Sequence, residues 1–187
     1  MGLLVVISSP SGGGKDSVIN ELLKEFSGSV RLVTTTSRLP RPGNIAGVDY
    51  YFISQAEFKE KIKNAEMVEY NNYAGNYYGI EKEKLSEALE KNEIVFTQIE
   101  VNGKHSLDQL GIKHLAIFLL PDDLNNLADR IRKRKGVSEK KIKERLETAK
   151  KEIEKSGDYD YRIINVEGEF DKTIAKIREI LLKKLNY

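Results

Sequence analysis

The sequence predicts an α/β fold, in which a central, mainly parallel five-stranded sheet is flanked by helices and carries a small inserted mixed α/β subdomain. Three observations predict this fold. The run Leu3-Leu4-Val5-Val6-Ile7 is continuously apolar, as strands buried on both faces are. Similar runs then alternate with segments of helical periodicity. Residues 38–78 interrupt this alternation with six of the nine tyrosines and with short apolar runs that look antiparallel, which indicates an insertion.

The remaining elements follow from apolar spacing. After the first strand, we expect strands at residues 30–36, 94–99, 114–120 and 161–166. Between them the spacing predicts helices at residues 17–26, 55–64, 82–91, 122–134, 138–155 and 171–185. Ser138 is a suitable N-cap for the fifth of these helices.

Composition limits the possible functions. The chain has 187 residues, which suits one domain, and 31 Lys+Arg against 29 Asp+Glu leave a net charge of only +2. That charge is too small to attract nucleic acid or an anionic membrane, so we expect neither as a partner. The absence of cysteine excludes disulfides and thiolate metal sites and agrees with a cytoplasmic location. The sequence leaves open whether the protein is a monomer or a homodimer.

A glycine-rich segment lies between the first strand and the first helix, where a phosphate-binding loop belongs. It reads Ser9-Pro10-Ser11-Gly12-Gly13-Gly14-Lys15-Asp16-Ser17. Glycines let backbone N–H groups approach phosphate oxygens, and the following helix directs its positive end to the same point. The alternative is an ordinary glycine-rich turn with a surface lysine. The flanking strand and helix favour a nucleotide site in which Lys15 binds the phosphates.

This loop departs from the usual G-x-x-x-x-G-K-[ST] pattern at two positions. Ser9 replaces the first glycine, and Asp16 replaces the hydroxyl residue that ligates Mg²⁺. A carboxylate is itself a good Mg²⁺ ligand, but without metal it repels phosphate. We therefore take Asp16 as the candidate magnesium ligand and expect strict metal dependence.

A second cluster of polar residues begins the inserted subdomain. It runs through Thr34-Thr35-Thr36-Ser37-Arg38-Leu39-Pro40-Arg41-Pro42-Gly43 and continues with Asp49-Tyr50. Two arginines held by prolines are able to clamp a phosphate with forked hydrogen bonds, and a tyrosine hydroxyl adds a further contact. Taken alone, a loop of prolines and arginines is more often an ordinary surface loop, so the interpretation depends on the neighbouring residues. With them, the arrangement suits a phosphomonoester as the second ligand.

Over nearly the whole chain the sequence resembles guanylate kinase. The residues that carry the resemblance are the loop Ser9 to Ser17, the stretch from Thr34 to Tyr50, Glu69, Gly75-Asn76-Tyr77-Tyr78-Gly79, the arginines Arg130, Arg134 and Arg145, and Tyr159-Asp160-Tyr161 leading to Asn165. The resemblance implies transfer of the γ-phosphoryl group of ATP to GMP, with Mg²⁺, to give ADP and GDP.

The resemblance also implies roles for individual residues. Arg38, Arg41, Tyr50 and Tyr78 would hold the GMP phosphate, and Thr34 and Glu69 would bind the guanine edge. Glu100 would also belong to the GMP site. Arg130, Arg134 and Arg145 would belong to a lid that closes over ATP, and Asn165 would lie near the adenine. Lys15, Arg38 and the lid arginines would stabilise the transferred phosphoryl group. The implied parts are a core (1–33, 81–121 and 156–187), a GMP-binding subdomain (34–80) and a lid (122–155).

Two departures from the family pattern leave alternatives open. The family usually has Asp-x-Asp where this chain has Gln98-Ile99-Glu100, and a hydroxyl residue where it has Ile80. The Gly-Lys-Asp-Ser loop and Val101-Asn102-Gly103 also suit ribose 1,5-bisphosphate phosphokinase, a relative that would not need Arg38, Arg41 or Glu69. A non-catalytic phosphopeptide-binding module of the same fold is a third reading, against which the three glycines and Lys15 argue.

Overall fold

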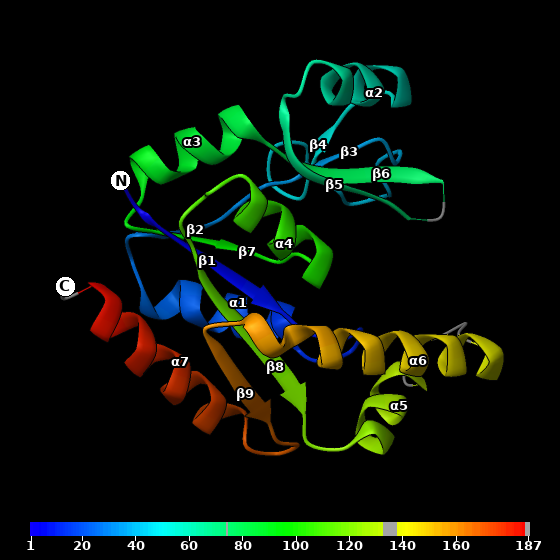
Figure 1. Cartoon of the computed structure of the whole chain (residues 1–187), viewed down its shortest axis with the longest axis vertical. Coiled ribbons are helices and arrows are strands. Elements are labelled where there is room, and N and C mark those ends of the chain that lie inside the picture. The colour runs from blue at the N-terminus through cyan, green and yellow to red at the C-terminus, as the bar shows by residue number, and fades with distance from the viewer. Residues whose placement is uncertain (74, 133–137, 186–187) are drawn as a thin grey trace.

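The computed structural model describes residues 1–73, 75–132 and 138–185. Its centre is a five-stranded parallel sheet, shown in Figure 1, with the strand order β2-β7-β1-β8-β9. The strands are β1 (Leu3–Ser8), β2 (Ser29–Arg31), β7 (Ile94–Thr97), β8 (Leu115–Pro121) and β9 (Tyr161–Asn165). The predicted parallel five-stranded sheet is thus confirmed.

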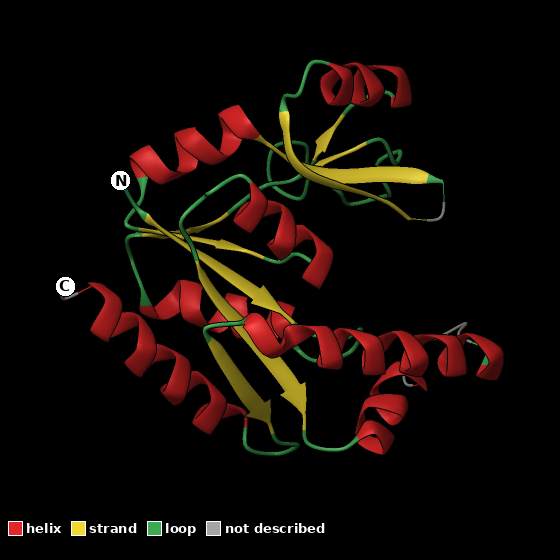
Figure 2. Ribbon diagram, in the orientation of Figure 1, coloured by secondary structure: helices red, strands yellow, loops and turns green. Residues whose placement is uncertain are grey.

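Helices cover both faces of this sheet (Figure 2), which explains the continuous apolar run in β1. Val5 and Ile7 pack on one face with residues of α1 (Lys15–Glu25) and α7 (Phe170–Leu185). Leu4 and Val6 pack on the other face with α3 (Lys82–Lys91) and α4 (Val101–Gln109). Successive side chains of a strand point to opposite faces, so a strand between two helical layers needs apolar residues at every position.

The four-stranded second sheet forms the inserted subdomain. Its order is β4-β3-β6-β5, with β3 (Thr35–Thr36), β4 (Tyr51–Phe52), β5 (Met67–Tyr73) and β6 (Asn76–Glu81), and α2 (Gln55–Lys63) belongs to the same segment. The β3–β6 and β5–β6 pairs are antiparallel, whereas β3 and β4 are parallel. The single strand expected at residues 30–36 is therefore wrong. The backbone stays hydrogen-bonded to β7 as far as Leu32, whose N–H donates to the Phe96 carbonyl. From Thr35 on, it pairs with β6 instead.

The segment expected to form the lid, which keeps that name below, contains α5 (Leu124–Arg132) and α6 (Glu139–Lys155), and both helices extend to the same side of the molecule as the second sheet in Figure 1. Apolar residues of the two helices form a small cluster around Leu127, Ile131 and Ile142. The Ser138 side chain caps α6 by accepting from the Lys141 amide, as the sequence predicts. None of the helices among the described residues is long and apolar enough to cross a membrane.

Two further element predictions need correction. Helix α4 was not expected, because Asn102 and Gly103 near its start read as a turn, yet Val101, Lys104 and Leu107 bury one face of it. The first helix begins at Lys15 rather than at residue 17, since the last glycine of the loop, Gly14, is its N-cap.

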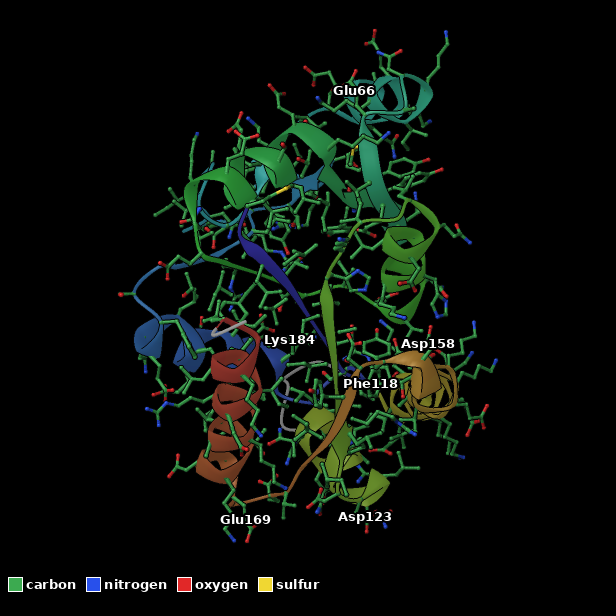
Figure 3. The ribbon with its side chains drawn as sticks, turned by 60° about the vertical axis from the view of Figure 1, so that its left-hand side comes forward. Glu66, Phe118, Asp123, Asp158, Glu169 and Lys184 are labelled. Atoms are coloured by element: carbon green, nitrogen blue, oxygen red, sulfur yellow. The ribbon has the colours of Figure 1, made fainter. Side chains whose placement is uncertain are left out.

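A hydrogen-bonded junction ties the segment after the lid to the centre of the fold. The Tyr159 hydroxyl donates to Ser8 Oγ at 2.8 Å, and the Ser8 hydroxyl donates to the Ile99 carbonyl at 2.6 Å. The Tyr159 ring packs on Phe118 of β8. Figure 3 places Phe118 on that strand and Asp158 just beyond the end of α6. The end of the lid is thereby anchored next to the glycine loop.

Candidate active site

The glycine loop has the backbone geometry of an anion-binding turn. Gly12 and Gly14 both have a φ of 91°, which side chains with a Cβ rarely allow. A Cβ at Gly13 would lie 2.7 Å from the Ser9 side chain. Gly14 is also the N-cap of α1, so the unpaired N–H groups and the positive end of that helix face the loop. The loop is therefore suited to bind phosphate.

Two clefts meet at Lys15. The lid cleft, of about 330 Å³, has the loop with Lys15 and Asp16 on one side and Glu100, Arg145 and Glu152 on the other. The β9 cleft, of about 410 Å³, is lined by Lys15 and Asp16 again and by Arg130, Asn165 and Glu167. A long ligand lying across the loop would occupy both.

In the described part of the chain, the lid cleft contains a charged side chain with an unsatisfied buried atom. Among the described residues, the Arg145 Nη1 atom is buried without a hydrogen bond. Burial and the negative charge of Glu100 raise the pKa of Glu152 to about 7, while Lys15 acts in the opposite direction. A buried arginine N–H group without an acceptor in a partly closed cleft favours an anionic ligand at that point.

Asn165 supports the loop rather than presenting a free amide. Its Nδ2 donates to the Gly13 carbonyl at 3.1 Å, and its Oδ1 accepts from the Thr173 hydroxyl at 3.0 Å. The side chain is 5% exposed. Asn165 lines the β9 cleft, and its main interactions fix the loop that forms the floor of that cleft.

A third cleft, of about 350 Å³, lies between the second sheet and α4. We call it the second-sheet cleft. Thr34, Tyr50, Glu69 and Tyr78 from the second sheet and its leading segment line one side. The other side is formed by the residues from 98 to 106 that line it, Glu100 among them. Four residues predicted from distant parts of the sequence are therefore brought together.

Glu69 is the most perturbed group in the second-sheet cleft. Burial, and then the nearby charge of Glu100, raise its pKa to about 7. A Cβ at Gly103 would lie only 3.1 Å from Glu69 Oε2, so the glycine of α4 makes room for this carboxylate. A half-buried carboxylate that lines a cleft is able to accept hydrogen bonds from two N–H groups of a ligand.

Arg38 lies beside this cleft and Arg41 lies further out. The Arg38 guanidinium is 5.5 Å from the centre of the Tyr50 ring and donates to Asn44 Oδ1 at 3.1 Å. The Tyr50 and Tyr78 rings meet edge to face, and burial together with Tyr78 raises the pKa of Tyr50. Arg41 is exposed, and its backbone N–H donates to the same Asn44 oxygen. Asn44 thus links the two arginines.

Glu100 connects the two halves of the site. It lines both the lid cleft and the second-sheet cleft, and its carboxylate accepts from Asn71 Nδ2 at 3.0 Å. A ligand bound to the glycine loop and a ligand bound beside Glu69 would therefore meet at Glu100.

The arginines expected in the lid line different clefts. Arg145 faces the lid cleft, whereas Arg130 lines the β9 cleft and donates from Nε to Glu167 Oε2 at 2.6 Å. Arg134 lies outside the described residues. The lid as described places one free arginine and one paired arginine around the loop.

Three residues of the site were missed by sequence reasoning. Glu152 looks like one of many charges on a solvated helix, although it lies on the face of α6 that carries Arg145, seven residues earlier. Asn71 and Gly103 act through contacts with Glu100 and Glu69 that only the fold creates. Gln98, in contrast, was noted as a departure, and its Oε1 is buried without a partner among the described residues.

The profile of the guanylate kinase family matches residues 1–184. A guanylate kinase of Listeria innocua is 41% identical over 181 residues, which cover 96% of this chain and 87% of that protein. A guanylate kinase of a Wolbachia species from Brugia malayi is 38% identical over 184 residues, covering 98% and 93%. A crystal structure of guanylate kinase from Anaplasma phagocytophilum aligns with a TM-score of 0.74 at 29% identity, covering 98% of this chain and 86% of that one.

Proposed function

The chain belongs to the guanylate kinase family, and on that basis we propose that it transfers the γ-phosphoryl group of ATP to GMP, giving ADP and GDP. One observation carries the proposal: the lid cleft at Lys15 and the second-sheet cleft at Glu69 meet at Glu100. Two phosphorylated ligands bound in these clefts would have their phosphates facing one another, as a direct transfer requires.

The donor side is assigned to the loop and the two clefts around it. The backbone N–H groups of Gly12, Gly13 and Gly14 and the Lys15 ammonium would bind the ATP phosphates. The nucleoside would extend into the β9 cleft, beside Asn165 and Arg130. Asn165 then contributes mainly by fixing the loop through Gly13.

The acceptor side is assigned to the second-sheet cleft. Glu69 as a carboxylate would accept from the N1–H and the 2-amino group of guanine, with Thr34 and Glu100 nearby. Adenine has no matching pair of donors, so this contact discriminates between the purines. Arg38, Arg41, Tyr50 and Tyr78 would bind the phosphate of GMP, and Arg38 already lies against the Tyr50 ring.

The transfer step needs cations more than it needs a nucleophilic side chain. An oxygen of the acceptor phosphate attacks the γ-phosphorus while the bond from phosphorus to the β–γ bridging oxygen breaks, and negative charge spreads over the oxygens in between. Lys15 and Arg145 line the same cleft, in which that charge would develop. Arg130, Arg134 and Arg38 are proposed to add positive charge from the lid and the acceptor side.

The donor set near the loop fits a magnesium ion. The Asp16 side chain is 62% exposed, lines both clefts at Lys15, and has one oxygen, Oδ1, bonded to Arg31. We propose Asp16 as the protein ligand of Mg²⁺, which when bound to ATP would neutralise the charge between its β and γ phosphates. Exposed carboxylate oxygens are suitable ligands for this hard cation.

The division of the chain follows from the same proposal. We assign residues 1–33, 81–121 and 156–187 to the core, residues 34–80 to the GMP-binding subdomain and residues 122–155 to the lid. In support of this division, the second sheet begins at Thr35 and both α5 and α6 lie within 122–155, whereas β6 extends one residue past the second boundary, to Glu81. Monomer or homodimer, a cytoplasmic location and the absence of nucleic-acid partners remain expectations from the sequence.

A coupled assay of ADP formation tests the proposed reaction. The purified chain is given MgATP with GMP, dGMP, AMP, UMP or ribose 1,5-bisphosphate in turn. We expect turnover with GMP, weaker turnover with dGMP and none with the other three. Turnover only with ribose 1,5-bisphosphate would identify the related sugar phosphokinase, and turnover with none would identify a binding module. The Lys15→Met variant controls for contaminating kinases.

A further inference from the structure

Arg31 of β2 forms hydrogen bonds with the first turns of α1, at the residue that follows Lys15. Its Nη1 donates to Asp16 Oδ1 at 3.1 Å, and its Nη2 donates to the Asp16 carbonyl at 3.3 Å and to Asn20 Oδ1 at 3.0 Å. One guanidinium thus holds both the side chain and the backbone of Asp16. A planar fork of donors is suited to such a contact, which a lysine cannot reproduce.

The position of Asp16 gives this contact its importance. Asp16 follows Lys15 in the sequence and lines both clefts that contain Lys15. A carboxylate at that point opposes the binding of phosphates, because like charges repel across a few ångströms. The arginine beside it supplies the compensating positive charge within the protein itself.

Arg31 does not line either cleft at Lys15. It lines a different hollow, on the side of Val30, Leu32 and Tyr51. Its side chain is 29% exposed, compared with 62% for Asp16. Arg31 therefore contacts Asp16 from outside the two clefts at Lys15. Any influence of Arg31 on nucleotide affinity acts through Asp16 rather than through direct contact with phosphate.

We propose that Arg31 is a positioning residue that serves as an internal counter-ion for Asp16 and competes with the divalent cation of the nucleotide for this carboxylate. The inference rests on the proposed ATP site. Without metal, Arg31 neutralises Asp16 and permits nucleotide binding. With metal, Asp16 would supply a carboxylate oxygen to the cation, while Arg31 would keep its bonds to the Asp16 carbonyl and Asn20. The strict metal dependence expected from the sequence is therefore relaxed by Arg31.

The test is calorimetric titration with ADP, in EDTA and in Mg²⁺, of four proteins: wild type, Arg31→Met, Asp16→Asn and the double variant. In EDTA, Arg31→Met should weaken ADP binding about three- to tenfold, since Asp16 is then left without compensation. In the Asp16→Asn background the same substitution should change the affinity less than about twofold. Mg²⁺ should remove most of the difference between wild type and Arg31→Met.

The controls separate the inference from the proposed function. Lys24→Met removes an exposed cation from the same helix, which pairs only with Glu21 among the described residues, and should leave ADP affinity unchanged. Arg31→Lys keeps the charge and should recover part of the affinity in EDTA, which a loss of folding would not permit. Equal losses from Arg31→Met in the wild-type and Asp16→Asn backgrounds would overturn the inference alone. Failure of the wild type to bind ADP at all would overturn the proposed function.

Discussion

Glu69 on β5 lies directly opposite Ile80 on β6 in the antiparallel pair of the second sheet. Residues paired in this way send their side chains to the same face. Ile80 is 1% exposed and belongs to the apolar cluster with Val68 and Leu85. The carboxylate that we assign to guanine recognition therefore stands beside an apolar side chain that cannot donate to it, in agreement with its raised pKa.

Binding of GMP should depend on pH through Glu69. Its pKa of about 7 means that the acceptor form is the majority above pH 7 and is lost as the pH falls. The Kd for GMP should therefore rise about tenfold between pH 8 and pH 6, beyond the effect of the ionisation of GMP itself. Titrations of wild type and Glu69→Gln at each pH check this. Glu69→Gln should bind GMP weakly, and its Kd should keep only the pH dependence that comes from the ionisation of GMP. If Glu69→Gln showed the same pH profile as wild type, another group would be responsible for the titration.

Replacing Ile80 with threonine should move this transition to lower pH. A hydroxyl opposite Glu69 is able to donate to the ionised carboxylate and so lowers its pKa. The loss of apolar packing should reduce the free energy of unfolding by about 1–2 kcal/mol. The matched control is Ile80→Val, which loses apolar volume without adding a donor. If both variants shift the pH profile of GMP binding equally, the absence of a donor at position 80 is not the cause.

Removal of the Lys15 charge should suppress turnover while the fold stays intact. Lys15→Met should lower kcat by about two to three orders of magnitude, as expected for the loss of a preorganised cation at a developing charge. Steady-state kinetics with saturating MgATP and GMP measure the effect. Lys24→Met on the same helix is the control and should keep wild-type rates. A Lys15→Met enzyme with normal kcat would remove the loop from the mechanism.

Arg145 should act on the transfer step more than on binding. Its Nη1 atom is buried without a partner in the described structure, and it faces Lys15 across the lid cleft. Arg145→Met should therefore lower kcat by about a hundredfold and change the KM for GMP little. Lys151→Met, an exposed position on α6, provides the comparison. A large rise in KM with normal kcat would assign Arg145 to ground-state binding instead.

Lys104 should contribute to stability rather than to chemistry. It is 5% exposed and lies 2.8 Å from Asp158 Oδ2 and 2.9 Å from Asp108 Oδ2. Burial disfavours its charge, but the bonds to Asp158 and Asp108 outweigh burial and raise its pKa. Lys104→Met should lower the free energy of unfolding by about 1–3 kcal/mol in urea titrations, because it removes the hydrogen bonds to both carboxylates. The loss stays in this range because Asp108 and Asp158 are partly solvated and are not left buried without a partner. The exposed Lys91→Met variant should have little effect, and a comparable loss from it would remove the special role of Lys104.

The sequence predicted the elements whose signals are local. The apolar run of β1 and the spacing in α3 and α6 translate directly into strand and helices, and Gly12 and Gly14 mark the loop by their backbone requirement. Helix α4 was missed because Gly103 is read from the sequence as a turn residue. The structure gives another reason for the glycine, since a Cβ there would crowd the Glu69 carboxylate. The Asp16–Arg31 pair was also not predictable, since its members are fifteen residues apart and lie on different elements, helix α1 and strand β2.

The order of strands in the central sheet has a consequence for synthesis on the ribosome. β1 is the middle strand, and both of its neighbours, β7 and β8, are made much later in translation. Until Ile94 emerges from the exit tunnel, neither β1 nor β2 has its partner, and the apolar run Leu3–Ile7 remains without a hydrogen-bonded neighbour. Until then, the exposed apolar surface and the unpaired strand edges make the incomplete chain prone to aggregation.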